Sequence, residues 1–145
     1  MGLKINLGCG KTKKEGYIGL DVAPYADTQC DFEHDNIPYD NNSVDEIISN
    51  HVLEHLRDAQ NCLNECWRVL KKDGVFKIKV PYGLWDGASK PVHYQCITAC
   101  WFDWLRRKDI YEWYGYRSWD ILKLEEIKNK KGEIYEIYCE MSPRK

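Results

Sequence analysis

The first fifty residues alternate between short apolar runs and turn residues, a pattern typical of β-strands in an α/β protein. Apolar runs occupy residues 3–7 and 17–20, and a weaker one lies near residues 28–32. Residues 36–43 are rich in Pro, Asn and Asp, which favour turns. Residues 44–50 resume an apolar pattern that two acidic residues interrupt. We predict four short strands in this part of the chain.

A helical pattern begins after Asp58, which is placed to cap the first turn. Apolar residues then recur at three- and four-residue spacing, namely Ala59, Cys62, Leu63, Cys66, Val69 and Leu70. Lys71 and Lys72 suit the negative end of the helix dipole, and Gly74 is a natural stop. We therefore predict a helix that ends just before Gly74.

The second half of the chain continues the alternation of strands and helices. Residues 76–80 place two lysines between apolar side chains, which predicts a strand with one face better covered than the other. The chain is loop-like over residues 82–95, and residues 97–107 have a helical pattern. Residues 120–128 and 133–141 are predicted to form a hairpin. This order indicates an α/β fold with a mixed sheet, mostly parallel and ending in an antiparallel hairpin.

Composition and charge exclude several classes of function. With 145 residues, the chain is predicted to form one domain, residues 1–145. It is 43% apolar and 30% charged, and its net charge of −2 argues against a nucleic-acid partner or an anionic membrane surface. No run of about 18 apolar residues occurs, and no charged-then-apolar signal opens the chain. We therefore expect a cytoplasmic protein with no membrane span.

Seven cysteines include two pairs at C-x3-C spacing, Cys62 with Cys66 and Cys96 with Cys100. This spacing places both thiols of a pair on one face of a helix, and four such thiols would suit tetrahedral zinc. The tight C-x2-C turns of most zinc sites are missing, and free cysteine packs as a small buried hydrophobe. We predict buried cysteines and no metal site, with a metal or a disulfide as the alternatives.

Candidate chemistry concentrates where the first strands end. The first apolar run leads into Gly8-Cys9-Gly10, and the second ends on Asp21. Glycines allow the backbone to approach a ligand, and a carboxylate at a strand end can accept hydrogen bonds from ribose hydroxyls. Only ten residues separate Gly10 from Asp21, whereas a dinucleotide-binding fold places the acid roughly 20 residues on, after a helix. We predict a nucleoside site whose first helix is truncated.

Two further strand ends carry polar or aromatic residues. Asp31-Phe32 follows the third predicted strand, where a carboxylate could accept from an exocyclic amine and a ring could cover a purine. Asn50-His51 ends the fourth. Ligands of open α/β sheets lie outside the carboxyl ends of the strands, so we expect all of these residues to converge.

Taken together, these segments resemble the class I S-adenosylmethionine-dependent methyltransferases. The similarity is carried by Asn6–Gly10, Leu20-Asp21, Asn42–Ile48, His51–Leu56, Trp67–Phe76, and Val92-His93-Tyr94 with Thr98. It is greatest to a small branch of the type 11 methyltransferases, in which N-L-G-C-G is followed quickly by G-x-I-x-x-D. The resemblance covers residues 3–107 and implies a Rossmann-like fold with S-adenosylmethionine as the cofactor.

The resemblance also implies a role for each strand end. The implied cofactor-binding residues are Gly8, Cys9, Gly10, Asp21, Asp31, Phe32, Asn50 and His51. Of these, Asp21 would hold the ribose hydroxyls, residues 31–32 would border the adenine, and residues 50–51 would lie near the sulfonium. Lys11 or Thr12 would hold the methionine carboxylate in place of the missing helix.

Methyl transfer to an oxygen or nitrogen can require a general base, and histidine titrates in the suitable range. His51 at a strand end and His93 in the loop after the fifth strand are the candidate catalytic residues. His55 and Glu54 are interpreted as structural, and His34 has no special position. The predicted reaction is methyl transfer from S-adenosylmethionine to a small-molecule or glycan-type acceptor. The alternatives are a degenerate protein that binds the cofactor or its product without turnover, as a regulatory or assembly partner, and a nicotinamide-binding protein of the same fold.

Two features bear on partners. Residues 110–119 hold five aromatic side chains near three arginines, which could stack bases or sugars. We favour the interpretation that this run covers the sheet edge or forms a dimer contact. A homodimer could also cover the side of the sheet that the missing helix exposes.

Overall fold

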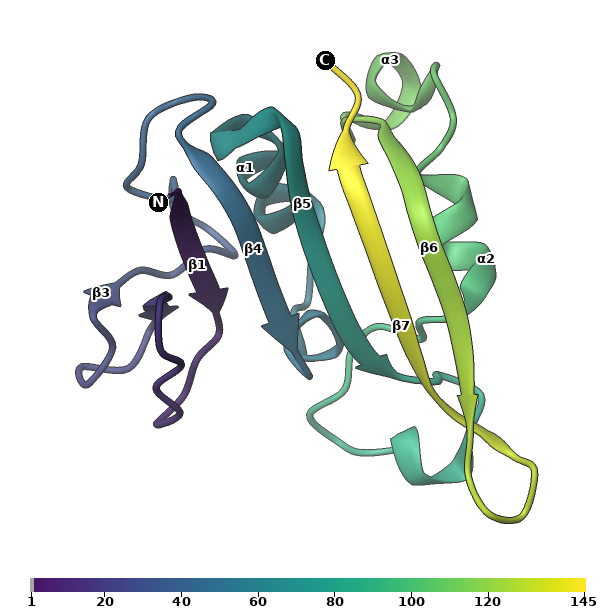
Figure 1. Ribbon diagram of the computed structural model, residues 1–145. Helices are drawn as coiled ribbons and strands as arrows, with labels where there is room; N and C mark the ends of the chain where they lie inside the picture. Colours follow the sequence, from purple (N-terminus) through teal and green to yellow (C-terminus); the bar gives the residue numbers. More distant parts are fainter. Residues whose placement is uncertain (1) are drawn as a thin grey trace.

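The computed structural model describes residues 2–145, and its centre is one seven-stranded sheet (Figure 1). The strands are β1 (Leu3–Leu7), β2 (Ile18–Asp21), β3 (Thr28–Gln29), β4 (Val44–Asn50), β5 (Leu70–Pro81), β6 (Trp119–Lys128) and β7 (Ile134–Pro143). Their order is β3-β2-β1-β4-β5-β7-β6, and β7 is antiparallel to both of its neighbours while the other pairs are parallel. The predicted α/β fold, mostly parallel with a C-terminal antiparallel hairpin, is confirmed.

The connections on the two sides of β1 differ. The chain runs outward from β1 to β2 and β3, and then returns to β4 and β5 on the other side of β1. Because crossovers between parallel strands are right-handed, helices in these two halves would cover opposite faces. Residues 8–17 and 22–27 connect the first three strands without a helix, so the predicted truncation of the first helix is confirmed.

The helices therefore cover one face of the sheet. They are α1 (Gln60–Val69), α2 (Ala99–Trp104) and α3 (Ile110–Tyr114), and Figure 1 shows α1 and α2 behind the sheet. We call this side the covered face and the opposite side the open face. Within residues 2–145, no helix has the length and apolar character needed to cross a membrane.

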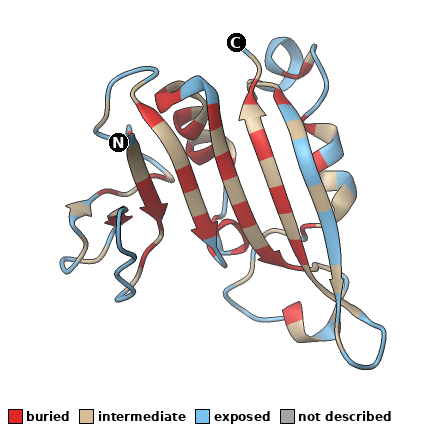
Figure 2. Cartoon of the chain, viewed as in Figure 1, coloured by how far each residue is buried: buried red, intermediate tan, exposed pale blue. Residues whose placement is uncertain are grey.

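The core lies between the sheet and the helices (Figure 2). In β5, Phe76, Ile78 and Val80 are fully buried, while Lys77 and Lys79 alternate with them on the open face. The same alternation of buried and partly exposed positions occurs in β4 and β7. The sequence-based prediction of one face better covered than the other is confirmed.

Polar side chains on the open face pair with one another. Lys77 Nζ lies 2.9 Å from Glu46 Oε2, and the Tyr17 hydroxyl donates to the same carboxylate. Burial raises the pKa of Glu46, but the hydrogen bonds from Tyr17 and Lys77 outweigh burial and hold this pKa below its usual value. Burial and the neighbouring Glu46 raise the pKa of Tyr17 to about 12. Lys79 Nζ also lies 3.9 Å from Glu136 Oε1, so the open face is a network of ion pairs.

The structure corrects the boundaries of three predicted elements. Helix α1 ends at Val69, several residues before Gly74, because Leu70 has an extended conformation and begins β5. Residues 71–74 then bulge out of the pairing between β4 and β5. Strand β3 is two residues long and α2 is six, so both are shorter than predicted.

The seven cysteines are all free thiols, and their burial divides them. Cys62 and Cys66 are fully buried in α1, and burial raises the pKa of the Cys66 thiol. Cys96 and Cys100 are exposed, so the prediction of buried cysteines is wrong for this pair. The reason is that Cys96 precedes the short helix α2, which buries Phe102 rather than its cysteine.

The aromatic run near the C-terminal third is split between core and surface. Ile110 and Trp119 are fully buried, and the Trp119 ring centroid lies 6.2 Å from that of Phe76. Trp119 begins edge strand β6 and packs into the core, so the predicted cover of the sheet edge or dimer contact by the whole run stays a prediction. Trp113 on α3 is 70% exposed.

Candidate functional site

The turn after β1 has a conformation that glycine permits. Gly8 and Gly10 have φ angles of 64° and 54°, in the left-handed region. The Gly8 amide donates to the Leu20 carbonyl at 2.7 Å, and a Cβ at Gly8 would lie 2.4 Å from the Val52 side chain. A Cβ at Gly10 would meet no atom of residues 2–145 within 4 Å, so this side of the turn is open to a ligand.

Asp21 stabilises this turn from the end of β2. Its Oδ2 accepts a hydrogen bond from the Gly10 amide at 2.8 Å, and its Oδ1 accepts one from the Ala23 amide at 3.0 Å. Asp21 is half-buried, and each of its oxygens retains a lone pair for a further donor. The structure therefore brings the predicted ribose-binding carboxylate and the glycine turn together.

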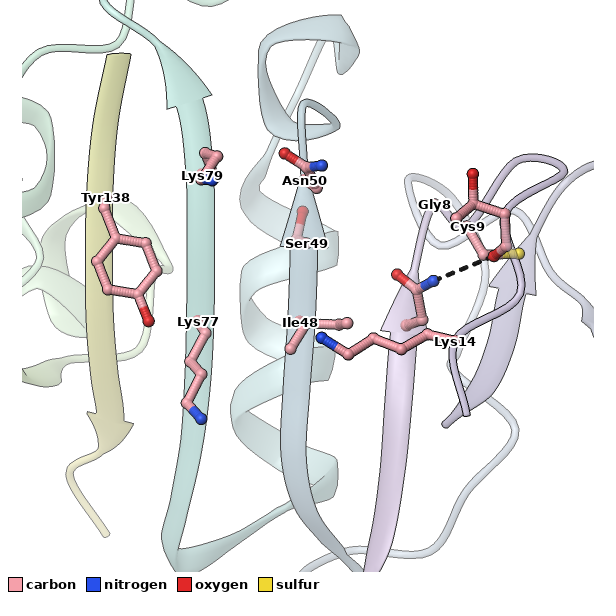
Figure 3. A pocket seen from close by; sticks show the side chains of 11 residues that line it. Gly8, Cys9, Lys14, Ile48, Ser49, Asn50, Lys77, Lys79 and Tyr138 are labelled. Carbon is pink, nitrogen blue, oxygen red and sulfur yellow. Dashed lines mark hydrogen bonds between the residues drawn. The ribbon is translucent and has the colours of Figure 1, made fainter. Parts of the chain in front are cut away.

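A hollow of about 350 Å³ lies on the open face, between the glycine turn and the end of β4 (Figure 3). Its lining residues are Asn6, Gly8, Cys9, Thr12, Lys14, Ile48, Ser49, Asn50, Lys77, Lys79 and Tyr138. Figure 3 shows Lys14 reaching from the turn toward Ile48, with Lys77 and Tyr138 beyond. The hollow is thus polar and cationic, with a single aliphatic side chain from β4 at its floor.

The predicted cofactor residues fall into two groups. Gly8, Cys9 and Asn50 line the hollow, whereas Gly10, Asp21, Asp31, Phe32 and His51 lie outside its lining. Phe32 is 6% exposed and packs in the core, so little of its ring faces solvent. Asp31 accepts a hydrogen bond from the Glu33 amide at 3.2 Å, and its Oδ2 lies 2.9 Å from His34 Nδ1. The hollow therefore adjoins the glycine turn rather than the predicted adenine side.

Several lining residues were not identified from the sequence. Lys77 from β5 and Tyr138 from β7 reach the hollow because β5 and β7 are paired, a contact between distant segments that has no local sequence signal. Of the two residues predicted to hold the methionine carboxylate, Thr12 lines the hollow, whereas Lys11 Nζ lies 5.9 Å from the Tyr25 ring centroid. Lys14 is the cation that the turn contributes to the lining of the hollow.

His51 lies directly after β4 and between two carboxylates. Its φ of 55° is a left-handed conformation in a non-glycine residue, which is often found at functional sites. Its Nδ1 lies 3.5 Å from Glu54 Oε1, and its Nε2 lies 2.8 Å from Glu136 Oε2. Glu54, and then Glu136, raise the pKa of His51 despite its partial burial. These carboxylates favour the protonated imidazole, which donates hydrogen bonds but cannot accept a proton.

His93, the second candidate catalytic residue, lies near the short 3-10 helix η2 (Asp86–Ala88). Its Nδ1 lies 2.8 Å from the Ala88 carbonyl, and its ring packs edge-on against His55 with centroids 4.7 Å apart. His93 lines a separate hollow of about 210 Å³, together with Tyr94 and Cys96. The structure therefore places the two predicted catalytic histidines outside the lining of the larger hollow, and their catalytic roles stay predictions.

Comparison with known proteins agrees with the arrangement of sheet and turn. The profile of the methyltransferase domain family matches residues 6–78, which include β1, the glycine turn, Asp21, β4 and α1. The chain belongs to this family. Membership indicates S-adenosylmethionine as the cofactor, in agreement with the resemblance found in the sequence.

A curated relative from Mycolicibacterium smegmatis is named a probable S-adenosylmethionine-dependent methyltransferase. It is 39% identical over 99 residues, and the match covers 53% of this chain and 37% of the relative. The match with this chain therefore spans well under half of that protein.

Solved structures share the fold at low sequence identity. The [4+2]-cyclase SpnF has a TM-score of 0.71 at 13% identity, covering 98% of this chain and 74% of that one. A second match is a chain of the Haloferax volcanii complex between the Trm112 methyltransferase activator and a methyltransferase. Its TM-score is 0.67 at 15% sequence identity, and the match covers 99% of this chain and 83% of that one. A Listeria monocytogenes S-adenosylmethionine-dependent methyltransferase has a TM-score of 0.64 at 12% sequence identity, and the match covers 99% of this chain and 92% of that one. Because one neighbour is named a cyclase, the shared fold alone does not determine the reaction.

Proposed function

We propose that this protein transfers a methyl group from S-adenosylmethionine to a small-molecule or glycan-type acceptor. The observation that carries the proposal is the hollow between the glycine turn and the end of β4, in a chain of the methyltransferase domain family. Its volume of about 350 Å³ lies in the range of small-molecule sites, roughly 300–1,000 Å³. A site of this size on a chain of net charge −2 suits a small acceptor rather than a nucleic acid.

The residues around the hollow fit the polar groups of the cofactor. Asp21 lies outside the lining but holds the adjoining glycine turn, and its free lone pairs suit the ribose hydroxyls. Thr12 and Lys14, which line the hollow, provide donors for a carboxylate. When bound, S-adenosylmethionine supplies a sulfonium-activated methyl group. The residues of the chain then contribute mainly by orientation, which can supply roughly 7–11 kcal/mol in favourable cases. Asn50 lines the hollow at the end of β4 and would lie near the sulfonium.

Binding is the first test of this proposal. Calorimetric titration with S-adenosylhomocysteine should show one site per chain, and NAD should not bind. Asp21→Asn should weaken S-adenosylhomocysteine binding about 10- to 100-fold, because hydrogen bonds to a charged carboxylate contribute roughly 1.5–3 kcal/mol. Asp120→Asn is the matched control, because Asp120 lies on the distant edge strand β6. Binding of NAD in place of S-adenosylhomocysteine would contradict the proposal.

Turnover is the second test. We expect S-adenosylhomocysteine to accumulate when the protein is incubated with S-adenosylmethionine and a panel of hydroxylated, amine and glycan acceptors. Binding without product on any acceptor would favour the alternative of a degenerate binding protein. One observation favours this alternative: His51 pairs with two carboxylates, which stabilise its protonated form. A protonated imidazole cannot accept a proton and is therefore a poor general base.

A further inference from the structure

A buried carboxylate without a hydrogen-bond partner lies next to both candidate catalytic histidines. Glu54, in the 3-10 helix η1 (Leu53–His55), is 1% exposed. Among residues 2–145, neither of its carboxylate oxygens has a hydrogen-bond partner. An ionised carboxylate that is removed from water without compensation is strongly unfavourable. His51 Nδ1 lies 3.5 Å from Glu54 Oε1, which is close enough for charge attraction but too long for a good hydrogen bond. Glu54 therefore favours a further positive group beside it.

In their neutral forms, the imidazoles of His55 and His93 have a lone pair on Nε2, the ring nitrogen available to bind an ion beside Glu54. His55 Nδ1 lies 3.0 Å from the Val92 carbonyl, and His93 Nδ1 lies 2.8 Å from the Ala88 carbonyl. A carbonyl can only accept, so each Nδ1 carries the proton and each Nε2 of a neutral ring keeps a lone pair. Histidines that bind metals are commonly oriented in this way, with the second ring nitrogen donating to a backbone carbonyl. His55 Nε2 lies 3.7 Å from Glu54 Oε1.

These three side chains form a compact donor set. One ligand atom from each of Glu54, His55 and His93 lies within 4.8 Å of the others. We infer that Glu54, His55 and His93 bind a divalent transition-metal ion. Two imidazoles and one carboxylate are the ligands of known zinc and iron sites that keep a further position open. The two nitrogen donors favour a transition metal over Mg²⁺, which prefers oxygen ligands.

A second cluster of the same residue types shows what distinguishes this site. Asp31, Glu33 and His34 also bring their ligand atoms within 4.8 Å of one another. Their oxygens are already used, since Asp31 accepts from the Glu33 amide and Glu33 Oε1 accepts from the Asp58 amide. This cluster is also exposed or half-buried and has no orphaned carboxylate. It therefore serves as an internal control rather than as a second site.

The site is accessible from solvent. The His55 side chain is 43% exposed, and His93 lines the hollow of about 210 Å³, from which a fourth ligand can come. Glu54 lies four residues after Asn50, which lines the hollow beside the glycine turn. A metal there would hold an oxygen of the acceptor, a role that rests on the proposed methyl transfer. The binding of the ion itself does not depend on that role.

This inference departs from the sequence-based prediction of no metal site. That prediction weighed the cysteines as ligands and interpreted Glu54 and His55 as structural. The metal-binding arrangement depends on a contact between η1 and the loop containing His93. His93 lies 38 residues after His55 in the sequence. Spacing along the chain could not indicate it.

The test is metal binding by the chelator-treated full chain. Calorimetric titration with Zn²⁺ alone should show one site per chain, and Mg²⁺ should not bind. His93→Ala should weaken Zn²⁺ binding more than about 100-fold, because even loss of an outer-shell partner costs 10- to 100-fold. Glu54→Gln removes the charge with little change of shape and should have a similar effect. His34→Ala and Cys96→Ser should leave the Zn²⁺ affinity unchanged.

Spectroscopy gives a readout that loss of folding cannot mimic. Co²⁺ should bind the unaltered protein with an absorption spectrum of nitrogen and oxygen ligation, without a thiolate band, and circular dichroism should show that His93→Ala is folded. Absence of Zn²⁺ binding, or its loss in His34→Ala or Cys96→Ser but not in His93→Ala, would overturn the inference. S-adenosylhomocysteine titration of the same samples reports on the proposed function separately.

Discussion

The two faces of the sheet are formed by the same strands but are stabilised differently, one by apolar packing and the other by ion pairs. On the covered face, side chains such as Phe76 and Ile78 are fully buried against helices. On the open face, the intervening Lys77 pairs with Glu46 and Lys79 lies near Glu136. Parallel strands covered on both faces are usually apolar throughout, whereas these strands alternate. The truncation of the first helix is therefore matched by the composition of β4, β5 and β7, which lie outside the truncated segment.

The same division separates the hydrophobic core from the candidate site. The covered face holds the large apolar side chains of the core. The open face holds the hollow beside the glycine turn. Because the candidate site is on the polar side, its residues can be changed with less effect on the core. This difference can be tested by matched substitutions on the two faces.

The largest expected effect is on the covered face. Phe76→Ala should lower the free energy of unfolding by about 3–5 kcal/mol, because it removes a buried ring and leaves a cavity. Lys77→Ala, one residue further along β5 and on the open face, should cost less than about 1 kcal/mol. Urea denaturation of both variants measures the two values. Similar losses for the two variants would show that the faces do not differ as described.

The sequence predicts the covered face better than it predicts the open one. The alternation of Phe76, Ile78 and Val80 with lysines indicates both the strand and its buried side, because burial imposes a period of two. It does not indicate where α1 ends, since Leu70 turns into β5 instead of continuing the helix. That choice depends on the pairing of β5 with β4, which is a tertiary effect.

The candidate site is predictable in part for the same reason. Gly8, Cys9 and Asn50 are found from the sequence because they lie next to strand ends in a known pattern. Tyr138 is not, because it reaches the hollow only through the pairing of β5 with β7. Phe32 follows a strand as the pattern requires, but its ring is buried in the hydrophobic core.

A buried polar contact on the covered side should have the next largest effect. Glu65 is 8% exposed, and its Oε2 accepts from the Ile37 amide at 2.8 Å and from Arg68 at 2.7 Å. Glu65→Gln should cost about 1–3 kcal/mol, because a hydrogen bond to a charged group is lost in a buried place. Glu112→Gln on the exposed part of α3 is the control and should be nearly neutral. Chemical denaturation checks both, and a neutral Glu65→Gln would mean that α1 does not anchor the connection after β3.

A pH dependence is expected from the open face. The pKa of Glu46 is lowered in the folded protein, where burial is outweighed by Tyr17 and Lys77. The charged form of Glu46 therefore contributes stability above its unfolded pKa of 4.5, and this contribution is lost as the pH falls through the lowered folded value. Glu46→Gln should cost about 1 kcal/mol at pH 7 and nothing in strong acid. Urea denaturation of both proteins across this pH range measures the difference, and a constant difference would refute the assignment to ionisation.

The smallest effect gives the most direct test of whether the open face is exposed in solution. A double-mutant cycle with Glu46→Gln and Lys77→Met should give a coupling of about 0.3–1 kcal/mol at low salt. In 1 M NaCl the Debye length falls to about 3 Å, so the coupling between these side chains should shrink if water reaches them. The matched cycle on Glu65 and Arg68 should change less, because Glu65 is shielded by the connection after β3.

A homodimer across the open face makes the contrary prediction for the same measurement. A second copy would exclude water from Glu46 and Lys77, so their coupling would persist in salt and would rise with protein concentration. Sedimentation velocity at the same concentrations would then show a dimer. We expect the coupling to depend on salt and not on protein concentration. The charged side chains of the open face are already paired with one another, and within residues 2–145 these pairs leave no apolar patch there that a second copy would bury.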